Sequence, residues 1–348
     1  MSHLTYAEAG FVGLLQGITE LFPVSSLGHA VLIPALVGGQ WAQDLDVSKP
    51  ESPYLAYIVG LHVATATAMI VFFWRDWLRI IKAFFVSLGH VAAPARGTNR
   101  FEPQDTDQAL AWMIVLATIP VGIAGLALEH DFRVYFSKPV LVSIFLFCNG
   151  LILLSGERAR RRSAEMEAQE IAADMQAVSE RQKAAVAAGA SAGGGRHSSG
   201  QRALKQQHAS LAVESDRRIT RRVGWLGAFG LGASQILALL PGISRDGTVM
   251  VCGMFRHLSR QDAARFSFLL SAPVIFAAGV LKIGDLTGPL GAGIRGPILF
   301  GSLLSFFGAY FSLRFLMRYF GNPKRTLTPF AIYCLVAGLA CFIYLSVR

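Results

Sequence analysis

The sequence predicts an all-α polytopic membrane protein, with six transmembrane helices and two re-entrant helical hairpins in an inverted-topology repeat. Hydrophobic residues make up 53% of the 348 residues and charged residues only 16%, against about 25% in soluble domains. Several apolar segments reach about 20 residues, the length that crosses a bilayer as a helix. Two further apolar stretches are interrupted near their middle by polar residues next to proline or glycine, which is typical of re-entrant hairpins.

The first interrupted stretch is apolar from Tyr6 to Phe22, breaks at Pro23 and continues from about Leu27 to Val37. Neither half is long enough to span a bilayer, so a re-entrant hairpin is predicted. Glu20 lies inside this stretch. A charged side chain at mid-membrane costs roughly 2.5–3.5 kcal/mol on insertion scales, so the hairpin is expected to line a polar cavity.

Three spans complete the first half, residues 1–154. They are predicted at Tyr54–Trp74, Leu110–Leu128 and Val140–Leu154. The segment between the first two is rich in Arg and Lys, so it is expected to be a cytoplasmic loop.

A polar insert, residues 155–222, separates the halves. Good helix formers dominate to about Ala188, and the Gly/Ser/Ala-rich residues 189–200 are expected to be a flexible linker. Its arginines place the insert in the cytoplasm. A solvated spacer is the simpler interpretation, with a regulatory or partner-binding role as the alternative.

The second half, residues 223–348, repeats the pattern. Val223 to Leu240 is apolar, the chain breaks at Pro241-Gly242, and a short apolar piece runs from Thr248 to Phe255. Three further spans are predicted, at Phe266–Ile283, Pro297–Phe315 and Pro329–Leu345. Each half thus holds one hairpin and three spans, and the loop charges give the halves opposite orientations.

The second break carries residues suited to a phosphate group. It reads Pro241-Gly242-Ile243-Ser244-Arg245-Asp246-Gly247-Thr248. A glycine-rich turn that leads into a helix exposes backbone N–H groups, and a helix N-terminus attracts anions. Arg245 adds a planar, permanently charged fork. The expected phosphate-binding residues are Ser25, Ser244, Arg245, Gly247 and Thr248.

The first break supplies groups that could do chemistry. Glu20 is a candidate base or metal ligand, Ser26 a candidate nucleophile and His29 a candidate acid or base. Each also has a structural alternative: Glu20 could form a buried ion pair with Arg245, Ser26 could cap a helix, and His29 could be a core histidine. The other histidines with apolar surroundings, His62, His90 and His257, are expected to be structural.

These motifs resemble the undecaprenyl-diphosphate phosphatase family, also called the BacA or UppP bacitracin-resistance family. The matching residues are Gln16-x-x-x-Glu20, Pro23-Val-Ser-Ser-x-Gly-His29 and Pro241-Gly-x-Ser-Arg-x-x-Thr248, against the family patterns (E/Q)xxxE and PGxSRSxxT. The resemblance covers both hairpins and the span order.

The resemblance implies a hydrolase that converts undecaprenyl diphosphate to the monophosphate carrier of peptidoglycan synthesis and confers bacitracin resistance. It implies a divalent cation, Mg²⁺ or Ca²⁺, with Glu20 as a ligand and Gln16 as a weaker one, and a site on the periplasmic side of the bacterial inner membrane. Carried over, Glu20, Ser26, His29 and Arg245 are the catalytic residues. Two departures stand out: Gln16 where many members have glutamate, and Asp246 where serine is usual.

Other functions remain to be separated from hydrolysis. Inverted repeats with broken helices also build transporters, so a polyprenyl-phosphate flippase is the alternative. The net charge of +10 fits basic cytoplasmic loops, so no nucleic-acid partner is expected. The expected partners are the polyprenyl diphosphate and membrane lipids, and a homodimer is left open.

Overall fold

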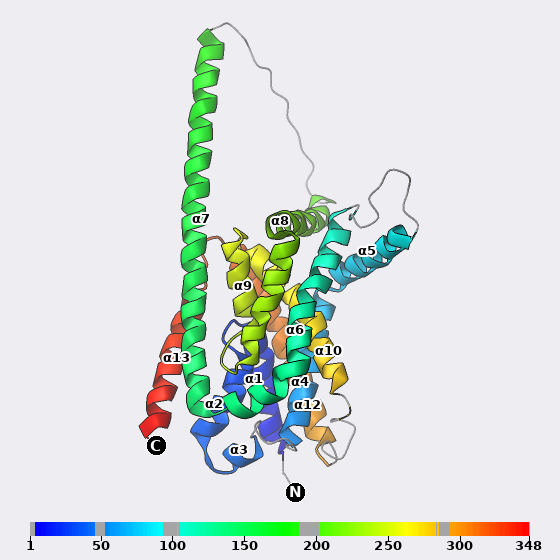
Figure 1. Ribbon diagram of the computed structural model, residues 1–348, viewed down its shortest axis with the longest axis vertical. Coiled ribbons are helices and arrows are strands. Elements are labelled where there is room, and N and C mark those ends of the chain that lie inside the picture. The colour runs from blue at the N-terminus through cyan, green and yellow to red at the C-terminus, as the bar shows by residue number, and fades with distance from the viewer. Residues whose placement is uncertain are drawn as a thin grey trace.

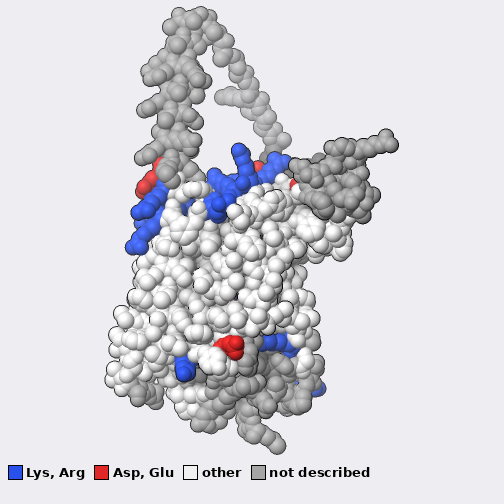
Figure 2. All heavy atoms as spheres, in the orientation of Figure 1, with Lys and Arg blue, Asp and Glu red and all other residues white. Residues whose placement is uncertain are grey.

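The computed structural model describes residues 4–45, 53–92, 103, 105–187, 202–282, 284 and 293–347. Helices and short turns make up this described part, and it contains no strand (Figure 1). The predicted all-α class is therefore confirmed. Figure 2 shows most of the Lys and Arg on this face in one band, and a few at the opposite end beyond a wide zone with few charges, a distribution typical of a membrane protein with one strongly basic end.

The first hairpin is present. Helix α1 (Tyr6–Leu21) begins at a capping box in which Thr5 and Glu8 exchange side-chain and backbone hydrogen bonds. After the break at Pro23, α2 (Ser26–Val37) begins at Ser26, followed by the short α3 (Gly39–Asp44). Since α1 and α2 are both too short to span a bilayer, they match the predicted re-entrant pair.

Six helices coincide with the predicted spans. They are α4 (Pro53–Phe72), α6 (Thr106–Phe136), α7 (Pro139–Ala187), α10 (Arg260–Leu281), α12 (Arg295–Gly321) and α13 (Thr328–Val347). Among the described residues, 5 helices are each long and apolar enough to cross a membrane, or up to 6 if a bent pair that contains α4 counts as one span.

A basic loop was predicted after the first span. This prediction is wrong for the first part of the segment, which forms helix α5 (Trp74–Ala92). A bend of 85° separates it from α4. Apolar residues recur at helical spacing in this segment, at Trp74, Leu78, Ile81 and Phe85, and basic residues lie between them. The segment is therefore amphipathic. These four side chains are exposed on the surface of the protein.

The insert is helical where it is described. Helix α7 continues unbroken to Ala187, and Figure 1 shows it rising far beyond the helical body. The predicted linker, residues 189–200, lies outside the described residues. Helix α8 (Arg202–Ser234) brings the chain back, with a kink at Gly224. The second hairpin follows as the 3-10 helix η1 (Gln235–Leu239), a break, and α9 (Arg245–Phe255).

Close helix pairs form the body of the protein. Helix α1 packs along α12, α8 along α6, and α7 along α13. The first of these pairs is close because small residues face each other: Gly13 lies against Gly301, and Gly17 against Ser305. The α1–α12 and α8–α6 pairings are those that a two-fold repeat would produce, and the inverted orientation of the halves stays a prediction.

Candidate active site

The two helix breaks touch each other. The backbone N–H of Gly242 donates to Ser25 Oγ at 3.1 Å. Gly28 lies so close to Gly242 that a Cβ atom on Gly28 would be 3.0 Å from the Gly242 Cα. Gly242 also has φ +112°, a backbone conformation that side chains disfavour. These glycines allow the contact that brings residues of both breaks into one site.

Asn149 on α7 joins the two breaks from the side. Its amide nitrogen donates to the carbonyl oxygen of Pro23 at 2.9 Å, and its amide oxygen accepts from the N–H of Ser244 at 3.0 Å. Asn149 is fully buried. Asn149 was not among the residues predicted for the site, although a single amide inside an apolar span indicates a functional or bridging residue.

Glu20 is the centre of the site. Its Oε2 atom accepts hydrogen bonds from the Gln16 amide at 2.8 Å and from the Ser26 hydroxyl. Its Oε1 atom accepts from Arg245 Nη2 at 2.6 Å. Both helix breaks therefore meet at one buried carboxylate, and four residues that the sequence predicted, Gln16, Glu20, Ser26 and Arg245, lie together.

Two helix N-termini converge at this carboxylate. Ser26 is the first residue of α2 and Arg245 the first residue of α9. The preceding serines cap these helices: Ser25 Oγ accepts from Gly28 N at 3.2 Å, and Ser244 Oγ accepts from Gly247 N at 3.1 Å. Since a helix N-terminus carries partial positive charge, the arrangement favours an anion beside Ser26 and Arg245.

The remaining predicted phosphate ligand, Thr248, is turned to the backbone. Its hydroxyl donates to the carbonyl oxygen of Arg245 at 2.8 Å, and the side chain is buried. In this structure the hydroxyls of Ser25, Ser244 and Thr248 thus hold the two breaks in shape. Arg245 and the backbone N–H groups of the helix starts are the groups left to meet a phosphate.

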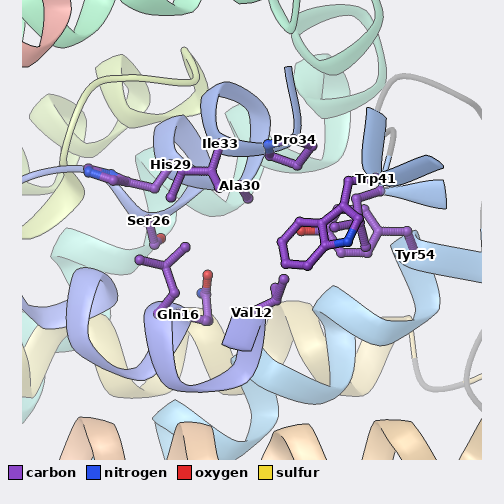
Figure 3. Close-up of a pocket in the computed structure, with 11 residues that line it drawn as sticks. Val12, Gln16, Ser26, His29, Ala30, Ile33, Pro34, Trp41 and Tyr54 are labelled. Atoms are coloured by element: carbon purple, nitrogen blue, oxygen red, sulfur yellow. The ribbon is translucent and has the colours of Figure 1, made fainter. Parts of the chain in front are cut away.

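The structure does not bring His29 to Glu20. Its Nδ1 donates to the carbonyl oxygen of Ser25 at 2.7 Å, and its Nε2 is 2.7 Å from the hydroxyl of Tyr333 on α13. The two rings also stack, 5.8 Å apart. The His29 side chain extends away from Gln16 (Figure 3).

Another histidine reaches the site instead. His62 on α4 places its Nε2 3.4 Å from the Gln16 amide nitrogen and 3.7 Å from Glu20 Oε2. His62 was expected to be structural, and its ring lies beside the Glu20 carboxylate. Its span gave no local motif, and only the packing of α4 against α1 and α12 brings it to Glu20.

An apolar pocket adjoins the site (Figure 3). It lies between α1 and α2, with Gln16 and Ser26 near one end and Trp41 and Tyr54 at the other. Its walls are otherwise almost entirely apolar, formed by Val12, Leu15, Ala30, Ile33, Pro34 and Leu45, with His29 as a further polar member. An apolar surface therefore lies directly beside the Ser26 hydroxyl.

The residues do not form a cation cage. Among the described residues, no group of three or more His, Cys, Asp or Glu side chains could hold a metal ion. Both oxygens of Glu20 already accept hydrogen bonds, and the nitrogen of the Gln16 amide, not its oxygen, faces that carboxylate. The chain alone thus does not fit a preformed Mg²⁺ or Ca²⁺ site, which needs several oxygen ligands.

The fold and the site define a class: a multi-pass helical membrane protein in which a serine and an arginine at two helix breaks meet at a buried carboxylate. The chain belongs to the family described as "Bacitracin resistance protein BacA", whose family model matches residues 9–210 and 203–340. The BacA family is a family of bacterial membrane proteins, in keeping with the apolar helices.

Curated relatives extend over the whole chain. A protein of Mycolicibacterium paratuberculosis named "Undecaprenyl-diphosphatase" is 53% identical over 349 residues, covering 100% of this chain and 99% of the relative. "Undecaprenyl-diphosphatase 2" of Frankia alni is 50% identical, covering 100% of each chain. "Undecaprenyl-diphosphatase 2" of Burkholderia orbicola is 34% identical, covering 95% of this chain and 94% of the relative.

Proposed function

We propose that this protein is an integral membrane phosphatase that hydrolyses undecaprenyl diphosphate to undecaprenyl phosphate and inorganic phosphate. The observation that carries the proposal is the convergence of Glu20, Ser26 and Arg245 at two helix N-termini. The apolar pocket beside Ser26 supports a lipid-linked substrate. The names of the relatives support the same reaction, and with it recycling of the lipid carrier for cell-wall synthesis and bacitracin resistance.

The site residues divide the work. The terminal phosphate of the diphosphate lies beside Arg245, whose guanidinium has five N–H donors and uses one on Glu20 in this structure. The N-termini of α2 and α9 add donors to the same anion. The first isoprene units lie against the apolar residues that line the pocket beside Ser26, and the rest of the tail lies in lipid.

Phosphate transfer then starts at Ser26. Its hydroxyl already donates to Glu20 Oε2, so the carboxylate takes the proton as Oγ attacks the terminal phosphorus. The new Oγ–P bond forms while the bond from this phosphorus to the bridging oxygen breaks, and the polyprenyl phosphate leaves with the electron pair. Water then cleaves the phosphoryl–serine bond and releases inorganic phosphate. Direct attack by water is the alternative route.

His29 has a different place in this scheme. From the sequence, His29 was a candidate acid or base for the reaction. We propose that it supports the start of α2, since its ring bonds the Ser25 carbonyl oxygen and Tyr333. A divalent cation, if the reaction needs one, would arrive bound to the diphosphate. We further propose that the site faces the periplasmic side of the bacterial inner membrane.

The test is release of inorganic phosphate from undecaprenyl diphosphate by purified protein in detergent. Ser26→Ala, Glu20→Gln and Arg245→Lys should each lower the rate by at least about 100-fold, since each removes a group that acts on the reacting phosphate. Ser155→Ala, Glu214→Gln and Arg217→Lys are matched controls away from the site. Lipid binding without phosphate release by folded wild type would contradict the proposal and favour a flippase.

A further inference from the structure

His62 enters the site from a helix that carries none of the motif residues. Its side chain is 26% exposed, and its ring lies beside the buried Glu20 carboxylate and the Gln16 amide. Direct chemistry on substrate would need His62 to reach Ser26 or the phosphate-binding side of Arg245. Its partners are instead Ile58, Gln16 and Glu20. The contact to Gln16 therefore decides what His62 does.

The orientation of the ring fixes which nitrogen faces the site. His62 Nδ1 is 2.9 Å from the carbonyl oxygen of Ile58, one helical turn earlier. A carbonyl oxygen only accepts, so Nδ1 carries the hydrogen. The neutral ring then presents the lone pair of Nε2 toward Gln16, whose amide nitrogen lies 3.4 Å away.

Gln16 is thereby held between two acceptors. One of its N–H bonds points to Glu20 Oε2 at 2.8 Å, and the other points to His62 Nε2. If His62 offered no lone pair, only the hydrogen bond to Glu20 Oε2 would hold the amide, and its plane could rotate about that single contact. Glu20 Oε2 also accepts the hydrogen bond from the Ser26 hydroxyl. The orientation of the Gln16 amide therefore controls the position of the carboxylate oxygen that takes the Ser26 proton.

We infer that His62 is a positioning residue for this reaction, holding the Gln16 amide so that Glu20 Oε2 faces the Ser26 hydroxyl. The inference rests on the proposed function. It also gives a role to Gln16, at a position where the family pattern (E/Q)xxxE allows glutamate or glutamine: an amide can donate to Glu20, whereas a second carboxylate at this position could not without a proton.

Two substitutions separate the nitrogens of the ring. His62→Gln places an amide oxygen near the position of Nε2 and can still accept from Gln16. His62→Asn places its amide near the position of Nδ1, so it keeps a group for Ile58 and leaves Gln16 without the acceptor. We expect His62→Gln to keep phosphate release within about threefold of wild type, and His62→Asn to lower kcat at least about tenfold with KM little changed, because small displacements of reacting groups are costly.

A double-mutant cycle tests whether the effect passes through Gln16. Adding His62→Asn to Gln16→Ala should cause no further loss of kcat, because the amide that His62 holds is already gone. A full additional loss in the double variant would overturn the inference. So would His62→Gln being as inactive as His62→Asn, since the ring itself would then be required, or His62→Asn matching wild type. A general folding defect would lower the melting temperatures of both variants alike.

A measurement without turnover separates this inference from the proposed function. In ¹⁵N-histidine-labelled protein in bilayers, the His62 signals, assigned by their loss in His62→Gln, should show hydrogen on Nδ1 and none on Nε2. Hydrogen on Nε2 would overturn the inference, because that nitrogen could no longer accept from Gln16. Absence of phosphate release by wild type would instead contradict the proposed function, and the NMR result would stand apart from it.

Discussion

Asp246 is a buried carboxylate at the position of the second serine in the family pattern PGxSRSxxT. Its Oδ1 atom accepts hydrogen bonds from Ser267 at 2.7 Å and from Ser271 at 2.5 Å, so it fastens the start of α9 to α10. It points to α10 while its neighbour Arg245 reaches Glu20. From the sequence alone, Asp246 could either orient Arg245 or stabilise the start of a helix. Its contacts with the two serines could not be foreseen, because the serines lie more than 20 positions away along the chain.

The role of Asp246 can be tested by stability. Asp246→Ala should lower the free energy of unfolding by about 2–5 kcal/mol, because it removes the acceptor of the buried Ser271 hydroxyl and leaves Ser267 with only the backbone carbonyl oxygen of residue 246, at 3.3 Å. Asp246→Asn keeps an amide oxygen for the same hydroxyls and should cost clearly less. Unfolding in mixed detergent provides the measurement. Equal losses for the two variants would show that the negative charge, rather than the hydrogen bonds, stabilises the contact.

Asn149 allows a second test at this scale, aimed at the contact between the breaks. Asn149→Leu should increase deuterium exchange in peptides covering residues 240–248, because the Ser244 N–H loses its acceptor. Phosphate release should fall along with this loosening. Asn322→Ala, which alters an exposed amide after α12, is the control. Unchanged exchange at Ser244 in Asn149→Leu would refute the bridging role.

At the scale of the elements, hydrophobic run length and the breaks at Pro23 and Pro241-Gly242 sufficed to predict the hairpins and spans. Local sequence could not predict contacts between distant helices, which is why His62 and Asn149 were missed. The prediction of a loop at α5 was wrong because it rested on the many basic residues there. It did not consider that apolar residues recur every three or four positions in the same segment. The ion pair between Glu20 and Arg245 could be proposed from the sequence because charged side chains inside a membrane need partners of opposite charge.

The close α1–α12 pair depends on a residue without a side chain. A Cβ atom on Gly13 would overlap the Gly301 carbonyl oxygen, so Gly13→Ala must push the helices apart. We expect a lower melting temperature and a loss of phosphate release, since α1 carries Gln16 and Glu20. Gly125→Ala on α6 is the matched control, because nothing lies within 4 Å of a Cβ there. A Gly13→Ala protein as stable as Gly125→Ala would contradict this packing.

At the scale of the whole molecule, ion pairs tie four helices together. Arg265 on α10 contacts Asp76 of α5 at 2.9 Å and Asp216 of α8 at 3.0 Å. Arg79 of α5 contacts Asp216 again and Asp107 of α6. Asp216 is fully buried, and its contacts with these two arginines offset the cost of burying its charge. The network fixes α8, and with it the chain that leads into the second break.

Breaking this network should destabilise the whole fold. Asp216→Ala removes the buried carboxylate between Arg79 and Arg265, leaves Asp76 as the one carboxylate that both arginines contact, and should cost about 3–5 kcal/mol in the free energy of unfolding. Asp131→Ala removes an exposed carboxylate and should be near neutral. Thermal unfolding of both variants gives the comparison. Similar melting temperatures would mean that the network contributes little.

The central claim is that Ser26, assisted by Glu20, attacks the terminal phosphate of a polyprenyl diphosphate. The most direct measurement uses substrate labelled in that phosphate, with acid quenching during the first turnover. The account predicts label on Ser26 in wild type, located by mass spectrometry of the peptide, and none in Ser26→Ala. Phosphate release without labelled Ser26 at any time, together with an active Ser26→Ala protein, would contradict it.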